Sequence, residues 1–348
     1  MSTGPVMLDI EGQELSAEDR RLLQHPAVGG VILFSRNFCD AAQLRSLVAE
    51  IHSLRHPRLL VGVDHEGGRV QRFRHDFTQL PPVRHLGEIH DRNPSLAREL
   101  ARETGWLMAA ELRALDVDLS FAPVLDLDRG VSQVIGDRAF HRDPDVVASL
   151  AHSYMHGMRD AGMAATGKHF PGHGGVAADS HTDMPVDGRE LADLLLEDLV
   201  PFERMARYGM AAVMPAHVIY PGVDEAPAGF SARWLREILR GRLGFQGVIF
   251  SDDLNMAAAD AGGDYAQRAR SAIAAGCDMV LICNNRPAAI EVVQALSGMD
   301  DPASASRRAR MHGKGHYGPD ELRAQDRWQS AVRRVAAYGR GDSLELEI

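Results

Sequence analysis

Eight short segments rich in apolar and β-branched residues recur along this 348-residue chain, and longer segments with helical periodicity separate most of them. The short segments are residues 6–9, 28–34, 59–64, 118–126, 165–170, 211–217, 247–253 and 279–284. The helical segments are residues 94–115, 144–161, 190–207, 232–242 and 265–275. Alternating strands and helices predict a parallel sheet with crossover helices, which is the α/β class. Eight such units predict a single-domain (β/α)8 barrel of the TIM type.

Polar or ionisable residues end many of the expected strands. They are Asp64, Asp126, His169, His217, Asp252, Asp253 and Asn284. In a barrel the carboxyl ends of the strands meet on one face, where active sites are found. The alternative is an open, doubly wound sheet, which often has a Gly-rich nucleotide-binding turn after its first strand. No such turn follows residues 6–9, so the barrel is the better prediction.

The alternating pattern ends near residue 300, so we expect the catalytic barrel domain to span residues 1–300. Residues 301–318 are rich in Ser, Arg and Gly and are typical of a mobile linker. A final helix is expected at about residues 319–337. We therefore expect residues 301–348 to form a linker and a C-terminal helix that packs on the barrel.

Composition excludes several classes of protein. The formal net charge is −10, and no long basic run occurs, so a nucleic-acid partner is not expected. The three cysteines, Cys39, Cys277 and Cys283, form neither a CxxC pair nor a disulfide framework, which favours a reducing compartment. The N-terminus lacks the pattern of a signal peptide, and no apolar run is long enough to span a bilayer. A cytoplasmic location without membrane contact is expected.

Three partial matches to cofactor or metal motifs fail for physical reasons. The P-loop-like residues 162–168 are followed by His169 instead of the Ser or Thr that would hold Mg²⁺. Residues 313–318 have the GxGxxG spacing but follow a polar, Arg-rich stretch and not a strand. Residues 65–69 begin like a zinc-protease motif, but two glycines disfavour its helix and Arg69 replaces the second His. No cofactor and no metal are therefore expected.

A Gly- and Pro-rich segment, residues 168–181, carries many functional side chains. Asp179 and His181 are two residues apart, so the carboxylate could fix the imidazole tautomer and raise the pKa of the imidazole. Such a pair suits general acid/base catalysis near neutral pH. The alternative is a surface loop whose histidines are solvated.

Two further strand ends carry charged side chains. Asp252 and Asp253 follow the expected strand that begins at residue 247, and they could be a metal site, a helix N-cap, or a nucleophile with a neighbour. Asp64, with Arg69 and Arg72 close behind it, would supply an acceptor and charged donors to a polar ligand. The alternative for this second group is a surface ion pair.

Four ordered motifs give the chain a resemblance to a known family. They are residues 63–72, 135–140, 168–174 with 179–181, and 247–256. In these motifs, and over most of its length, the chain resembles the single-domain bacterial β-N-acetylglucosaminidases of glycoside hydrolase family 3. The resemblance implies removal of terminal β-linked N-acetylglucosamine from 1,6-anhydro-muropeptides in cell-wall recycling. A monomer is expected.

The same resemblance implies roles for individual residues. Asp252 would be the nucleophile of a retaining double displacement, and His181, supported by Asp179, would be the general acid/base. The residues implied to hold the sugar are Asp64, Arg72, Arg138, Lys168 and His169.

Two alternatives to the hydrolase remain open at this point. A histidine acid/base repels anions less than a carboxylate does, so phosphate could replace water and make the protein a phosphorylase. A non-catalytic sugar-binding protein is the other alternative, although binding alone needs no nucleophile.

One departure from the family pattern is His65, where close relatives are expected to carry Gln.

Overall fold

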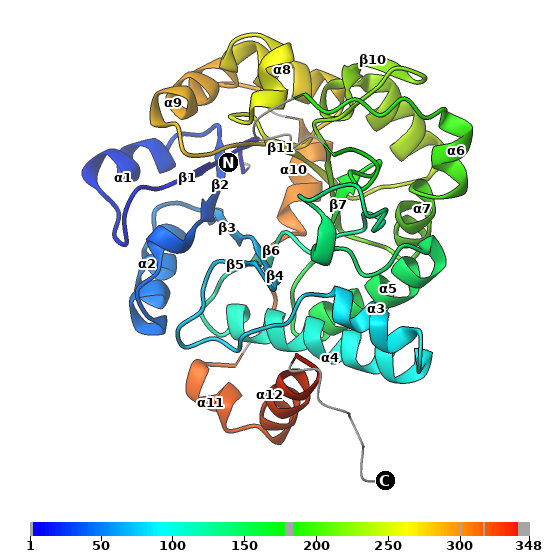
Figure 1. Ribbon diagram of the computed structural model, residues 1–348. Coiled ribbons are helices and arrows are strands. Elements are labelled where there is room, and N and C mark those ends of the chain that lie inside the picture. The colour runs from blue at the N-terminus through cyan, green and yellow to red at the C-terminus, as the bar shows by residue number, and fades with distance from the viewer. Residues whose placement is uncertain (1–2, 178–183, 300, 316, 340–348) are drawn as a thin grey trace.

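The computed structural model describes residues 3–177, 184–299, 301–315 and 317–339. Within these ranges, eight parallel strands form one sheet, and the expected α/β barrel is confirmed. Its strands are β1 (Val6–Asp9), β2 (Val28–Leu33), β3 (Leu60–Val63), β6 (Leu119–Ser120), β7 (Thr166–Phe170), β8 (Ala212–Pro215), β11 (Val248–Asp253) and β12 (Met279–Ile282). Each of them lies within one of the eight short segments picked out in the sequence. Figure 1 shows helices surrounding the strands on all sides.

Backbone hydrogen bonds close the sheet into a barrel. The strand order is β6-β3-β2-β1-β12-β11-β8-β7, and every neighbouring pair is parallel. The two outer strands meet just beyond β6, where Val124 forms a parallel bridge with Lys168. The amide of Leu125 donates to the carbonyl of Lys168 at 2.6 Å, and the amide of Thr166 donates to the carbonyl of Ala122 at 2.8 Å. The carboxyl ends of all eight strands therefore face the same end of the molecule.

Helices and short hairpins fill the connections between the strands. The first helices are α1 (Ala17–Leu23), α2 (Ala41–Ser53), α3 (Arg84–His90), α4 (Pro94–Arg113), α5 (Pro144–Asp160), α6 (Leu191–Leu196) and α7 (Leu199–Arg207). They are followed by the π-helix η4 (Arg233–Arg242), α8 (Tyr265–Ala275), α9 (Arg286–Ala295), α10 (Pro302–Ala309), α11 (Pro319–Arg323) and α12 (Asp326–Gly339). The hairpins pair β4 (His65–Gly67) with β5 (Val70–Gln71), and β9 (Ile219–Tyr220) with β10 (Asp224–Pro227). No helix in the described ranges is both long and apolar enough to cross a membrane.

Side-chain caps explain where the longer helices begin. Asn93 precedes α4 and accepts from the amide of Leu96 at 3.1 Å, and proline occupies the first turn. Asp143 caps α5 in the same way, again before a proline.

Two expected helices are each split in the structure. Residues 190–207 form α6 and α7, because the backbone at Glu197 leaves the helical region, and residues 319–337 lie in α11 and α12.

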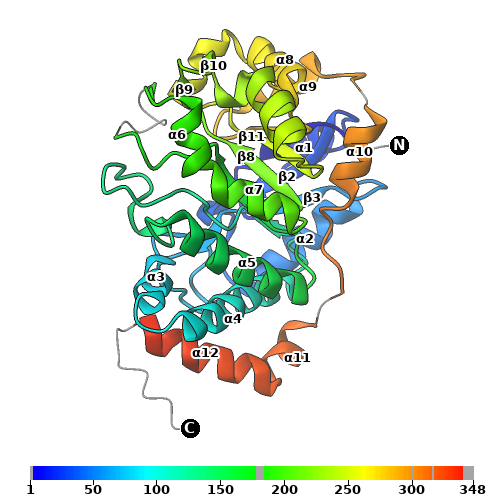
Figure 2. The ribbon, with the colours of Figure 1, turned by 90° about the vertical axis from the view of Figure 1, so that its right-hand side faces the viewer.

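The expectation of a mobile linker over residues 301–318 is wrong for its first half, which forms α10. Asp301 caps this helix by accepting from the amide of Ala303 at 3.0 Å. Arg308 is only 2% exposed and donates to the carbonyls of Thr3 and Asp278. An arginine of the expected linker therefore binds backbone groups at the base of the barrel. Figure 2 shows α10 beside the N-terminus, at the opposite end from the loops around α6 and β9.

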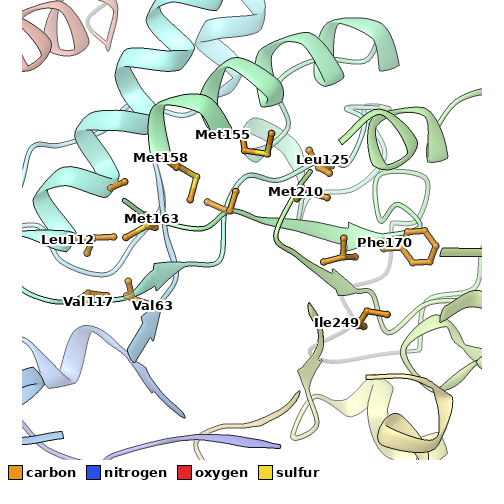
Figure 3. Close-up of a cluster of buried hydrophobic side chains, with 14 of the residues drawn as sticks. Val63, Leu112, Val117, Leu125, Met155, Met158, Met163, Phe170, Met210 and Ile249 are labelled. Carbon is orange, nitrogen blue, oxygen red and sulfur yellow. The ribbon is translucent and has the colours of Figure 1, made fainter. Parts of the chain in front are cut away.

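Apolar side chains pack on both faces of the barrel wall. Met7, Phe121 and Phe250 belong to a cluster inside the barrel, and Met311, just after α10, belongs to the same cluster and is fully buried. Alternate residues of the strands point outward and pack under the helices. Figure 3 shows part of this outer cluster, with Leu112 and other side chains beneath α4 and α5. Packing on both faces holds the strands in place, and it therefore also sets the positions of the polar residues at the strand ends.

Candidate active site

A cavity of about 640 Å³ opens at the carboxyl ends of the strands. This volume is within the range of small-molecule sites. All five residues expected to hold the sugar border it, and so does the expected nucleophile; they are Asp64, Arg72, Arg138, Lys168, His169 and Asp252. The barrel thus brings together residues that are up to 188 positions apart in the sequence.

Four charged side chains form a connected network on one wall of the cavity. Lys168, at the middle of β7, is 3% exposed, and its Nζ lies 2.8 Å from Oδ1 of Asp64 and 2.7 Å from Oε1 of Glu66. Arg138 donates from Nε and Nη2 to the two oxygens of Glu66, at 2.9 and 2.8 Å. Each buried charge therefore has a partner of opposite sign, which is the condition for keeping it ionised away from water.

The network controls the ionisation of its own members. Burial raises the pKa of Asp64, but the positive charges of Lys168 and Arg72 outweigh that effect and lower the pKa below its usual value. For Glu66, burial also raises the pKa, and Arg138 with Lys168 lowers it well below the ordinary range. Burial lowers the pKa of Lys168, whereas the two carboxylates raise it to above the usual value. All of these groups are charged at neutral pH, so this wall offers both hydrogen-bond donors and acceptors.

Sequence reasoning gave no role to Glu66, which the structure places at the centre of this network. Glu66 lies in the hairpin strand β4, directly after the strand-end residue Asp64 and its neighbour His65. The available signal was its position within the motif of residues 63–72. A glutamate that is 5% exposed must be paired, but burial could not be read from a segment rich in Gly and Arg.

The two arginines that follow Asp64 have different partners. Nη2 of Arg72 lies 3.5 Å from Oδ2 of Asp64, and its guanidinium also lies over the ring of Phe34, at 5.6 Å from the centroid. Arg69 does not contact Asp64. Its Nη2 donates to the carbonyls of Gln133 and Val134. Arg72 is therefore available to a ligand beside Asp64, whereas Arg69 ties the hairpin to the loop that leads to Arg138.

A second polar group surrounds Asp126 on the neighbouring wall. Nδ1 of His169 lies 2.7 Å from Oδ2 of Asp126, whose side chain is fully buried, and the amide of His173 donates to Oδ1 at 2.6 Å. Burial raises the pKa of Asp126, but the interactions with His169 and His173 outweigh it and lower the pKa. An ionised Asp126 fixes the orientation of the His169 ring, as a carboxylate does for a metal-bound or catalytic histidine. Asp126 is thus a supporting residue that was not among the expected sugar ligands.

Asp252 and Asp253 end β11 but do different things. Asp252 lines the cavity, and its Oδ1 accepts from the amide of Asp253 at 2.9 Å. Oδ1 of Asp253 accepts from the amides of Asn255 and Cys283, both at 3.0 Å, so it joins the ends of β11 and β12. Burial and the negative charge of Asp252 raise the pKa of Asp253 to about 7, against the two backbone hydrogen bonds.

This geometry distinguishes the two aspartates of the pair. The N-cap alternative does not apply to Asp252, which lies in a strand and whose side chain, among the residues described, is hydrogen-bonded only to the amide of Asp253. The turn is capped by Asp253. In the described part of the chain, no three His, Cys, Asp or Glu side chains are grouped so that they could hold a metal ion. The arrangement leaves Asp252 with one carboxylate oxygen free of protein hydrogen bonds within those ranges, as an attacking group needs.

Buried His217, at the end of β8, lies against the same strand end. Its Nε2 is 3.2 Å from the carbonyl of Asp253, and its ring stacks on that of Phe230. Burial lowers the pKa of His217, although the nearby charge of Asp252 partly opposes this. A neutral His217 can donate to that carbonyl and so hold the turn that carries the two aspartates.

The expected acid/base residues Asp179 and His181 lie outside the described residues. Ala177, shortly before them in the chain, lines the cavity. After them, Asp187 accepts from Arg189, which also donates to Asp198. These ion pairs anchor the described segment that leads into α6.

Comparisons with known proteins agree with this geometry. Residues 6–308 match the family described as Glycosyl hydrolase family 3 N terminal domain. The chain is 61% identical to a beta-hexosaminidase from Thioalkalivibrio sulfidiphilus, with all of both chains covered, and 58% identical to one from Nitrosospira multiformis, with 97% of each covered.

Similar solved structures indicate the same family. NagZ from Neisseria gonorrhoeae, in complex with N-trifluoroacetyl-D-glucosamine, superposes with a TM-score of 0.93 at 48% identity, covering 97% of this chain and 99% of that one. A glycoside hydrolase family 3 beta-N-acetylglucosaminidase from Paenibacillus gives a TM-score of 0.85 at 32% identity, covering 96% of this chain and 67% of the other. This chain therefore belongs to glycoside hydrolase family 3, among the bacterial β-hexosaminidases, and is a glycoside hydrolase.

Proposed function

We propose that this enzyme is a retaining exo-β-N-acetylglucosaminidase with Asp252 as its nucleophile. The observation that carries the proposal is the position of Asp252 in the same cavity as Asp64, Arg138, Lys168 and His169. The relatives named beta-hexosaminidase, and the NagZ structure that holds an N-acylated glucosamine analogue, support the choice of sugar.

The cavity walls provide complementary groups for one sugar ring. Carboxylates accept hydrogen bonds from hydroxyl groups, and Asp64 is kept ionised for this role by Lys168 and Arg72. Lys168, Arg72 and Arg138 donate to hydroxyl or acetamido oxygens, and His169 is held in place by Asp126. Since both donors and acceptors are already paired with one another, the ring would bind without a large rearrangement of the site.

The proposed reaction is a double displacement. Asp252 attacks the anomeric carbon, the bond to the leaving oxygen breaks, and His181, held by Asp179, gives its proton to that oxygen. A glycosyl ester of Asp252 results. Water then attacks the anomeric carbon while His181 takes its proton, and the sugar leaves with Asp252 restored. The roles of Asp179 and His181 rest on the sequence motif that contains them.

The finer assignments are part of the same proposal. We propose that the substrate is a peptidoglycan fragment with terminal β-linked N-acetylglucosamine on a 1,6-anhydro-muropeptide, and that the enzyme acts as a monomer in the cytoplasm during cell-wall recycling. We also propose that residues 1–300 form the catalytic domain, on which residues 301–315 and 317–339 pack.

The test of the nucleophile is release of nitrophenol from 4-nitrophenyl β-N-acetylglucosaminide. We expect wild type to turn over and Asp252→Ala to lose about 10³-fold or more in kcat. Asp193→Ala, at an exposed position of α6, is the matched control and should match wild type. Near-normal activity of Asp252→Ala would overturn the assignment.

Two readouts on wild type test the reaction class. Nuclear magnetic resonance of the first sugar released should show the β-anomer, which marks retention; the α-anomer would contradict the double displacement. With phosphate present, free sugar supports the hydrolase, whereas sugar 1-phosphate would establish the phosphorylase instead. Release of N-acetylglucosamine from the purified anhydro-disaccharide, measured against chitobiose, tests the natural substrate.

A further inference from the structure

A second cleft, of about 650 Å³, lies at the opposite end of the barrel from the candidate active site. It is bordered by Pro5, just before β1, and by residues 276–278, just before β12, so it faces the amino ends of the strands. Side chains of η4, α8 and α10 form its walls. Figure 2 shows α10 at this end of the molecule. Of the residues that the structure describes, none lines both this cleft and the active-site cavity.

The cleft is strongly positive. Among the described residues, five arginines line it: Arg236, Arg240, Arg270, Arg307 and Arg308. Two carboxylates in the same lining, Asp278 and Asp301, leave an excess of three positive charges. This excess stands out because the whole chain has a formal net charge of −10.

Structural roles account for three of the five arginines. Asp278 is 2% exposed; its Oδ2 accepts from Arg240 at 2.7 Å and its Oδ1 accepts from Arg307 at 2.9 Å. Arg308 donates to the backbone carbonyls of Asp278 and Thr3. These contacts dock α10 on the barrel. They also place the guanidiniums of Arg240 and Arg307 on one carboxylate, with Arg308 on the backbone carbonyl of the same residue. Burial, with the charge of Arg307, lowers the pKa of Arg240 against the opposing effect of Asp278.

The other two arginines have no carboxylate partner in the described chain. Arg236 is exposed and donates to the carbonyls of Ala274 and Ala275, at the end of α8. Arg270 is exposed and forms no hydrogen bond or ion pair with any described residue. Docking of α10 uses neither of them: Arg236 holds the carboxyl end of α8 and keeps its guanidinium at the cleft, and Arg270 makes no contact in the described chain that would account for its place there.

We propose that this cleft binds a small phosphate-bearing molecule, with Arg236 and Arg270 as its first contacts. A guanidinium matches the geometry of phosphate oxygens and is easily desolvated, so arginine suits this task better than lysine. The anion would also offset the repulsion among Arg240, Arg307 and their neighbours. The cleft has the volume of a small-molecule site, which favours a compact ligand over an acidic peptide.

Binding of pyrophosphate and of ADP to the full-length protein, measured by isothermal titration calorimetry at low ionic strength, tests the proposal. We expect saturable binding by wild type and at least about tenfold weaker binding by the double variant Arg236→Ala/Arg270→Ala. The matched control is Arg333→Ala, an exposed arginine on α12, which should bind as wild type does. Nitrophenol release and circular dichroism should be unchanged in all variants, because none of these arginines lines the active-site cavity.

Several outcomes would overturn the proposal. They are no binding of either phosphate probe at millimolar concentration, equal affinity of the double variant and wild type, or equal weakening by Arg333→Ala. Displacement by saturating N-acetylglucosamine would assign the anion to the active site instead. Binding of an acidic peptide without binding of pyrophosphate would make the cleft a protein-docking surface.

Discussion

Arg138 donates two nearly equal hydrogen bonds, 2.9 and 2.8 Å long, to the two carboxylate oxygens of Glu66. The side chains are 11% and 6% exposed, so water screens this pair only weakly. Glu66 also binds Lys168, which in turn binds Asp64. The proposed sugar ligands Arg138, Lys168 and Asp64 therefore form one electrostatic unit centred on Glu66, which is a positioning residue for the others.

Substitution Glu66→Gln should damage both the fold and the binding of substrate. The amide keeps the shape but removes the negative charge, so Arg138 and Lys168 are left with Asp64 as their nearest counter-charge. Breaking a buried ion pair costs about 3 kcal/mol of unfolding free energy. We expect a loss of that order in urea unfolding and a rise in KM of about tenfold or more, since about 1.4 kcal/mol of lost binding is tenfold.

A matched substitution separates this effect from a general loss of negative charge. Glu88→Gln removes the same charge from an exposed position of α3, and it should change neither the unfolding curve nor KM. Stability and KM of Glu66→Gln equal to those of Glu88→Gln would contradict the central role of Glu66.

The raised pKa of Asp253 predicts how stability depends on pH. Its pKa is about 7 in the folded protein, whereas an unfolded aspartate has its ordinary value near 3.8. Between these values the folded state binds the extra proton, so stability should fall as pH rises from about 4 through 7. Asp253→Asn keeps an oxygen that can accept from Asn255 and Cys283 and should lose this part of the pH dependence. Urea unfolding of wild type and Asp253→Asn at pH 5, 6, 7 and 8 measures this difference. The same dependence of unfolding free energy on pH in both proteins would refute the raised pKa of Asp253.

The barrel could be predicted from the sequence because its signals are local. Each strand is a short apolar run, and α5 begins with Asp143 and a proline, which are visible in any sequence. The convergence of Asp64, His169 and Asp252 on one cavity followed from the rule that strand ends meet on one face.

The rest depended on contacts between distant residues. Glu66 is buried only because Arg138, 72 positions away, and Lys168 reach it from other elements. The segment that forms α10 was expected to be a linker because its sequence does not show what its arginines bind. Their partners, Thr3 and Asp278, lie elsewhere in the chain. A segment rich in charged residues is expected to be exposed to solvent unless the buried groups that pair with its charges are known. In the sequence, only the family resemblance distinguishes the two aspartates of β11, because their different hydrogen bonds depend on how β11 and β12 meet.

His65 should make the protein sensitive to acid. It is 1% exposed, its ring lies near those of Phe73 and Phe77, and burial, together with the charges of Arg74 and Arg72, lowers its pKa to about 3. The unfolded state, with a histidine pKa near 6.5, binds more protons than the folded state between these two values. Stability is therefore lost as pH falls from about 6.5 towards 3.

Substitution His65→Gln, which introduces the residue expected in relatives, should remove that part of the acid sensitivity. Its stability relative to wild type should rise on going from pH 7 to pH 5, as measured by urea unfolding. His75→Gln is the control, because that side chain is 76% exposed and should leave the pH dependence unchanged. A relative stability of His65→Gln that is the same at both pH values would count against a buried, neutral His65.

The integration of α10 into the barrel predicts opposite results for two arginines that are two positions apart. Arg308 is buried and donates to the carbonyls of Thr3 and Asp278, so Arg308→Met removes charged hydrogen bonds to both carbonyls. We expect a loss of about 2 to 3 kcal/mol in unfolding free energy. Arg310, which is exposed, should tolerate the same substitution with little change. Urea unfolding of both variants measures this, and equal stabilities would mean that α10 contributes nothing to the barrel and that residues 301–318 behave as a linker after all.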